Sequence, residues 1–93
     1  MTLTERAEQV EAFGHAAAQR LQDWDREGGA GPERYRANVQ VAALMFGLAA
    51  RHWSDVAVER SPGPGRDEAI ARAADCQAKA EDFKARLTEG RER

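Results

Sequence analysis

The side chains of this 93-residue chain that are best suited to catalysis or metal binding are two histidines, one cysteine and a set of glutamates. If neighbouring helices pair as antiparallel hairpins, His52 comes level with Cys76 and with Glu8 and Glu11. A thiol, an imidazole and a carboxylate at one place suit a metal site, an activated thiolate or a redox-sensitive thiol. We therefore take His52, Cys76 and Glu11 as the candidate ligand or metal-binding residues. The alternative is that His52 is a hydrogen-bonded histidine at the edge of the core, and that Cys76 packs as a small apolar residue.

No other pattern in the chain predicts catalysis. His15 follows Glu11 by one helical turn, which lets the two side chains touch on one helix face. The segment "RHWSD" (51–55) contains His, Ser and Asp, but triad chemistry needs these residues to converge from different elements beside an oxyanion hole. A single cysteine forms no intrachain disulfide and no zinc-binding pair, and the sequence has no phosphate-binding loop. We expect no enzymatic activity and no cofactor.

Composition predicts a single domain spanning residues 1–93. Charged residues make up 32% of the chain, but the formal net charge is only −2, so no strongly basic or acidic partner is indicated. The N-terminal segment carries charges where a secretory signal needs an apolar run, and the longest apolar run, residues 41–46, is too short to span a bilayer. We therefore expect a cytoplasmic protein that does not enter the membrane.

Two segments rich in Gly and Pro, "EGGAGP" (27–32) and "SPGPG" (61–65), divide the chain into three parts of helical length. The parts are rich in Ala, Glu, Arg, Gln and Leu, which favour helices, and they lack the alternating pattern of strands. The sequence predicts an all-α bundle of three long helices at about 3–27, 32–60 and 65–89. Thr2 and Glu5 fit a capping box at the first helix, and Gly90 is expected to end the third.

The two outer helices each show a single seam of residues spaced alternately by four and three, as in helices that face one partner. Gly14 lies in the first seam, where it lowers helix propensity, so we expect a large side chain or another backbone to approach it closely. The seams comprise Leu3, Ala7, Val10, Gly14, Ala17, Leu21 and Trp24 in the first helix, and Ala69, Ala73, Cys76, Ala80, Phe83 and Leu87 in the third.

The middle helix is predicted to be the most buried, because it holds ten large apolar residues against five in the first segment and three in the last. On a helical projection these residues cover an arc of about 220°, wider than the stripe of about 100° that a surface helix needs. Two neighbouring helices do not obviously cover such an arc, so we expect part of it to form an interface. The predicted interface residues are Tyr35, Val39, Leu44, Met45, Phe46, Leu48 and Trp53.

The sequence therefore favours a non-enzymatic interaction protein, such as an adaptor, an accessory subunit or a regulator. It is expected to form a homo-oligomer, a dimer in the first place, through the middle helix, and to take a further protein partner through the same surface. One alternative is a helical bundle that binds a small ligand or a metal. Another is a DNA-associated regulator, although the basic residues of the third helix alternate with acidic ones, which makes nucleic acid a disfavoured partner.

Overall fold

Three helices follow one another along the chain: α1 (Leu3–Glu27), α2 (Pro32–Glu59) and α3 (Pro64–Glu92). The structure, a computed structural model, describes residues 1–27 and 32–92, with the side chains of residues 1–23 and 33–88. The predicted all-α three-helix bundle is confirmed. Residues 28–31 of the predicted break at 27–32, and the side chain of Trp24, lie outside the described residues.

The helix ends follow local hydrogen bonding. The Glu5 amide donates to Thr2 Oγ1 at 3.1 Å and the Thr2 amide donates to Glu5 Oε1 at 3.4 Å, which is the predicted capping box. Gly63, with φ of 152°, adopts a backbone conformation that favours glycine just before Pro64 opens α3. Gly90, expected to end α3, does not do so, since the helix continues through it to Glu92. One glycine lowers helix propensity but does not break the backbone hydrogen bonding.

Arg60 joins the three helices at one end of the bundle. Its guanidinium donates to the Gly65 carbonyl at 2.9 Å and to Thr4 Oγ1 at 3.0 Å. These bonds connect the residue after α2 with the first turns of α3 and α1.

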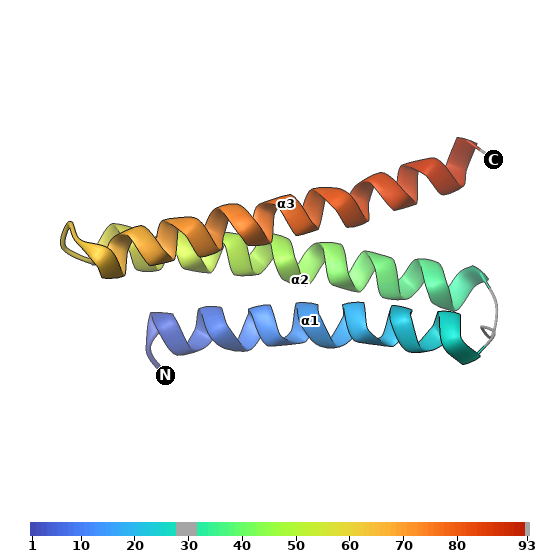
Figure 1. Cartoon of the computed structure of the whole chain (residues 1–93), viewed down its shortest axis with the longest axis horizontal. Coiled ribbons are helices and arrows are strands. Elements are labelled where there is room, and N and C mark those ends of the chain that lie inside the picture. The colour runs from blue at the N-terminus through green and yellow to red at the C-terminus, as the bar shows by residue number, and fades with distance from the viewer. Residues whose placement is uncertain (28–31, 93) are drawn as a thin grey trace.

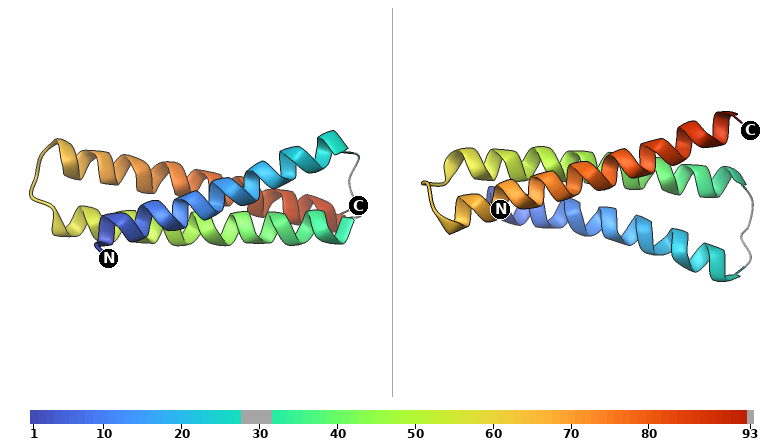
Figure 2. Two further views of the ribbon diagram at one scale, coloured as in Figure 1. Left: turned by 90° about the horizontal axis from the view of Figure 1, so that it is seen from below. Right: turned by 45° about the horizontal axis from the view of Figure 1, so that its top comes forward.

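α2 packs along both of its neighbours, whereas α1 and α3 approach each other only marginally (Figure 1). In the left view of Figure 2, α2 lies along the lower edge of the molecule over most of its length, with α1 and α3 on its other side. One face of α2 is therefore turned toward both neighbours, and the opposite face is covered by neither. No helix of the described chain has an apolar stretch long enough to cross a membrane.

The core is built from a few large side chains of α2 surrounded by alanines of all three helices. Phe46 and Trp53 are 1% and 2% exposed, and α1 and α3 contribute Ala7, Ala17, Ala69 and Ala80 against them. A Cβ atom added to Gly14 would lie 3.0 Å from the ring of Phe46. The expectation that a large side chain approaches Gly14 is confirmed, and it explains a glycine in the middle of α1.

Candidate functional site

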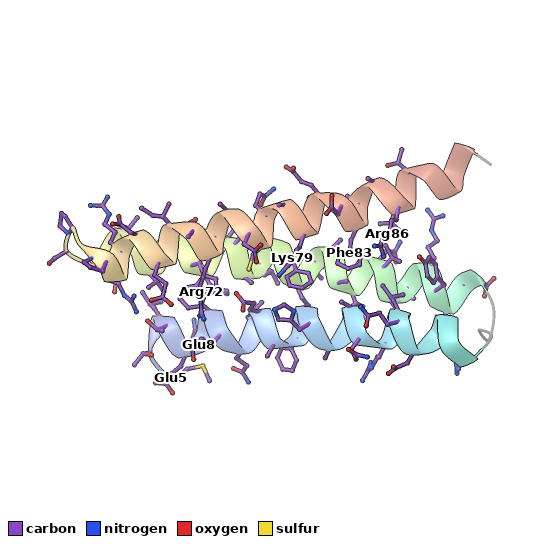
Figure 3. The ribbon with its side chains drawn as sticks, in the orientation of Figure 1. Glu5, Glu8, Arg72, Lys79, Phe83 and Arg86 are labelled. Carbon is purple, nitrogen blue, oxygen red and sulfur yellow. The ribbon has the colours of Figure 1, made fainter. Side chains whose placement is uncertain are left out.

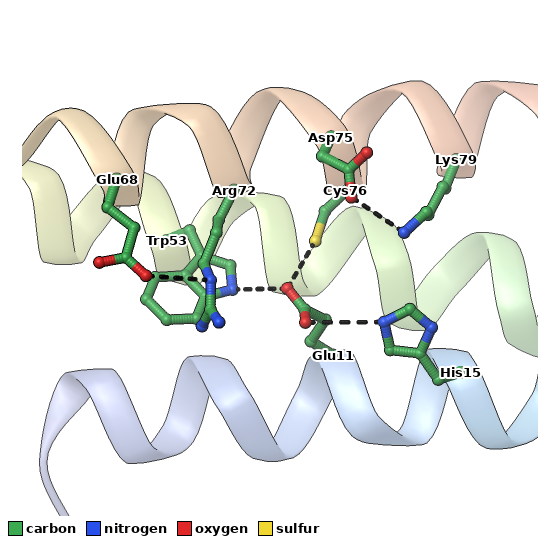
Figure 4. Close-up of polar contacts among 8 residues, drawn as sticks. All are labelled: Glu11, His15, Trp53, Glu68, Arg72, Asp75, Cys76 and Lys79. Carbon is green, nitrogen blue, oxygen red and sulfur yellow. Dashed lines mark hydrogen bonds and ion pairs between the residues drawn. The ribbon is translucent and has the colours of Figure 1, made fainter.

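Glu11 lies at the centre of the three helices and accepts hydrogen bonds from both of the others (Figure 4). Its Oε1 accepts the indole N–H of Trp53 at 3.1 Å and the thiol of Cys76 at 3.3 Å, while its Oε2 lies 3.6 Å from His15 Nε2. The Glu11 side chain is 21% exposed. The carboxylate therefore joins one residue from α2, one from α3 and one from its own helix.

Aromatic rings and cations continue this cluster along the space between α1 and α3. The ring of His15 meets the edge of Phe46 at 5.1 Å between centroids, and Phe46 stacks on Phe83 at 5.9 Å. Arg72 lies 4.6 Å from the Trp53 ring and Lys79 lies 5.5 Å from the Phe46 ring, both at cation–π distance. Figure 3 shows Arg72, Lys79 and Phe83 on the side of α3 that faces the other two helices.

Arg72 and Lys79 also form ion pairs within α3. Lys79 Nζ lies 2.9 Å from Asp75 Oδ2, and Arg72 Nε lies 3.7 Å from Glu68 Oε1, each one helical turn apart. Because Asp75 stabilises the ammonium group, the pKa of Lys79 is raised. Each of these two cations is thus paired with a carboxylate one turn before it on the same helix.

The environment of Cys76 keeps its thiol protonated. The residue is 0% exposed, and burial, the hydrogen bond to Glu11 and the nearby negative charges of Glu11 and Asp75 raise the thiol pKa from 9.0 to about 12, although Lys79 acts in the opposite direction. A reactive cysteine needs accessibility and a lowered pKa. Cys76 therefore donates a hydrogen bond in the core and is not set up as a nucleophile at neutral pH.

The structure brings Glu11 and Cys76 together but does not pair either with His52. Trp53, the next residue on α2, occupies the position that faces Glu11. Successive helical residues point about 100° apart, so His52, which is partly exposed, is directed away from this cluster. No group of three or more metal-ligating side chains occurs in the part of the chain that the structure describes. Of the three residues in the predicted site, His52, Cys76 and Glu11, only Glu11 and Cys76 are therefore in contact.

The hydrogen bond of Trp53 was not anticipated from the sequence. A buried indole N–H needs an acceptor. The hairpin register that places His52 level with Glu11 places Trp53 there as well. The need of a buried indole N–H for an acceptor, together with this register, is the signal that identifies Trp53 as the partner of Glu11.

The predicted interface residues divide into two groups. Val39, Phe46 and Trp53 are at most 2% exposed within the single chain, because α1 and α3 cover them. This part of the interface prediction does not fit the structure, since a side chain buried in the monomer has no surface to offer a second copy. Tyr35, Met45 and Leu48 are partly exposed, and Leu44 is 58% exposed.

In the middle of α2, apolar residues with exposed or partly exposed side chains form a stripe along the helix, whereas Val58, 80% exposed, lies apart from it near the end of α2. Leu44 and Val41, at 58% and 44% exposure, are accompanied by the exposed Ala37 and the partly exposed Leu48. Spacings of four, three and four residues place these side chains on one line. We call this set (Ala37, Val41, Leu44 and Leu48) the outer face of α2.

Two shallow hollows lie beside the outer face, between α2 and α3. One of about 260 Å³ is lined by residues that include Leu44, Gly47 and Leu48, and the next, of about 290 Å³, shares Arg51 and Gln77 with it. A third hollow of about 260 Å³ lies between α1 and α3 over Phe46 and Phe83. Pockets that enclose a small molecule usually measure about 300–1,000 Å³. These hollows are therefore better suited to receiving a side chain than to enclosing a ligand.

Comparisons of this chain with protein families, with curated proteins and with solved structures find no match.

Proposed function

We propose that this chain is a non-enzymatic helical interaction protein, acting as an adaptor, an accessory subunit or a regulator, and that it self-associates through the outer face of α2. The observation that carries the proposal is the exposure of Leu44 and Val41 on a helix whose opposite face forms the core. A contiguous apolar surface on a protein with a closed core is typical of a binding site.

Gly47 supports the same surface. It lies in the middle of α2, where glycine costs up to about 1 kcal/mol of helix propensity relative to alanine. A Cβ added to Gly47 meets nothing within 4 Å, so packing inside the chain gives no reason for the glycine. The open space at Gly47 belongs to the hollow next to Leu44 and Leu48, where it leaves room for a side chain from another molecule.

The chemistry of the interior favours an interaction protein over a catalyst. The thiol of Cys76 is buried with a raised pKa, and the Glu11 carboxylate that it contacts already accepts the Trp53 indole N–H. These groups satisfy each other's hydrogen bonds, which stabilises the packing of three helices.

The proposal is tested by light scattering coupled to size-exclusion chromatography, from about 10 μM to about 1 mM protein, the range in which a weak interface is populated. The mass should rise from 10.3 kDa toward twice that value as concentration increases. Leu44→Glu should hold the protein at the monomer mass with unchanged helicity, because a charge replaces the most exposed leucine. Glu8→Lys, on an exposed site of α1, is the control and should associate like the parent. A parent protein that stays monomeric throughout overturns the proposal.

A further inference from the structure

The outer face of α2 has a symmetry that specifies how a second copy would bind. Its four residues are arranged about the point midway between Ala42 and Ala43. When a second α2 is laid antiparallel across that point, Ala37 meets Leu48 of the second copy and Val41 meets its Leu44. Every layer then pairs an apolar side chain with another apolar side chain.

Charged residues at the two ends of the outer face match in the same arrangement. Glu33, in the first turn of α2, and Arg51 are both exposed. They are separated by five full helical turns, so they lie in one row along the same edge of the helix. Their positions are about 14 Å before and about 13 Å after the midpoint. An antiparallel second copy therefore places its Arg51 beside Glu33, and this pair occurs twice across the two-fold axis.

The opposite orientation is disfavoured by the same residues. In a parallel pair in register, the two-fold axis runs along the helices and places the edge that carries Glu33 and Arg51 on opposite sides of the two copies, so these residues find no oppositely charged partner. Only the antiparallel orientation gains the Glu33–Arg51 pairs, so electrostatics favours it over a parallel orientation that the apolar residues alone distinguish poorly. Among the residues whose side chains the structure describes, neither Glu33 nor Arg51 forms a salt bridge.

We propose that the outer face of α2 binds a second copy of this chain in an antiparallel two-fold arrangement, with Glu33 of each copy paired to Arg51 of the other. This inference rests on the proposed self-association and adds its orientation and its charge pairs. Four apolar layers on one helix form a smaller contact than the interfaces of permanent dimers. The association is therefore reversible, and screening of the two charge pairs makes it weaker at high salt.

Charge reversal tests the orientation. Glu33→Arg and Arg51→Glu, each alone, place like charges together at both ends of the antiparallel interface. Each variant should therefore raise the Kd of dimerisation about tenfold at low salt. The double variant Glu33→Arg/Arg51→Glu restores opposite charges and should return the Kd to within about threefold of the parent. Sedimentation equilibrium measures the Kd, and far-UV circular dichroism confirms that each variant is folded.

Matched controls separate this proposal from the proposed function. Glu8→Arg and Arg20→Glu on exposed positions of α1 make the same changes in net charge and should leave the Kd unaltered. If the parent dimerises and Leu44→Glu abolishes the dimer, but the double variant does not recover from the single ones, the antiparallel arrangement is overturned while self-association stands. If the parent never dimerises, both proposals fail.

Discussion

The two faces of α2 carry similar residues and have opposite environments. On the inner face, Phe46 and Trp53 are buried under α1 and α3, and Trp53 donates its indole N–H to Glu11. On the outer face, Leu44 is 58% exposed. The difference arises because α1 and α3 both pack on one side of α2, which leaves the other side uncovered. Apolar character along a helix therefore does not by itself show which residues the chain buries.

Truncation of one large residue on each face gives the largest expected contrast. Phe46→Ala removes a ring that contacts His15 and Phe83, and it should lower the free energy of unfolding by about 3–5 kcal/mol. Leu44→Ala, measured in dilute protein, should lower it by less than about 0.5 kcal/mol, because the side chain is solvated. Urea denaturation followed by circular dichroism measures both values. Equal losses in the two variants would show that the faces do not differ as described.

Removal of the central carboxylate tests the hydrogen bonds that hold the inner face of α2. Glu11→Ala leaves the buried Trp53 N–H and the Cys76 thiol without their acceptor, and it should cost about 2 kcal/mol of stability. Glu11→Gln keeps an acceptor oxygen and should cost less. The exposed Glu8→Ala on the same helix is the matched control, with a change of at most about 0.5 kcal/mol in the same urea experiment. An equal effect of Glu8→Ala would argue against the special role of Glu11.

Alkaline pH should weaken the inner face through Cys76. The raised pKa means that the fold favours the protonated thiol, so this contribution is complete below pH 9.0 and is lost as the pH rises toward about 12. Between pH 8 and pH 10 the parent should lose up to about 1.4 kcal/mol more stability than Cys76→Ala. Urea unfolding of both proteins in the presence of a reductant measures the difference. If the stability of the two proteins fell in parallel as the pH rose, the stabilising role of the protonated Cys76 thiol would be contradicted.

The two mid-helix glycines should respond with opposite signs. In Gly14→Ala the new Cβ lies 3.0 Å from the Phe46 ring, which Phe83 and His15 hold in place, so a net loss of about 1 kcal/mol is expected. In Gly47→Ala the new Cβ meets nothing within 4 Å, and the gain in helix propensity should stabilise the monomer by up to about 1 kcal/mol. Thermal denaturation in dilute protein measures both. The sign at Gly47 is decisive, since destabilisation there would indicate packing within the single chain.

The local structure of this protein follows from short-range features of its sequence. Capping by Thr2 and Glu5, the glycine and proline segment before α3, and the pairs one turn apart, such as Asp75 with Lys79, all depend on residues within a few positions of one another. Gly14 likewise predicted a close neighbour, because a glycine lowers the helix propensity of α1 and close approach of a large side chain explains its presence. Such features depend on helical geometry alone, and helical geometry follows from the residues nearby.

Only the tertiary structure decided which residues meet across helices. A shift of one residue along α2 replaces His52 with Trp53 opposite Glu11, and the sequence pattern does not fix the rotation of a helix to that precision. It also does not fix on which side of α2 the other two helices pack, and this choice buries Phe46 and exposes Leu44. Both outcomes depend on the fit of large side chains against small ones over three helices at once, which no single segment contains.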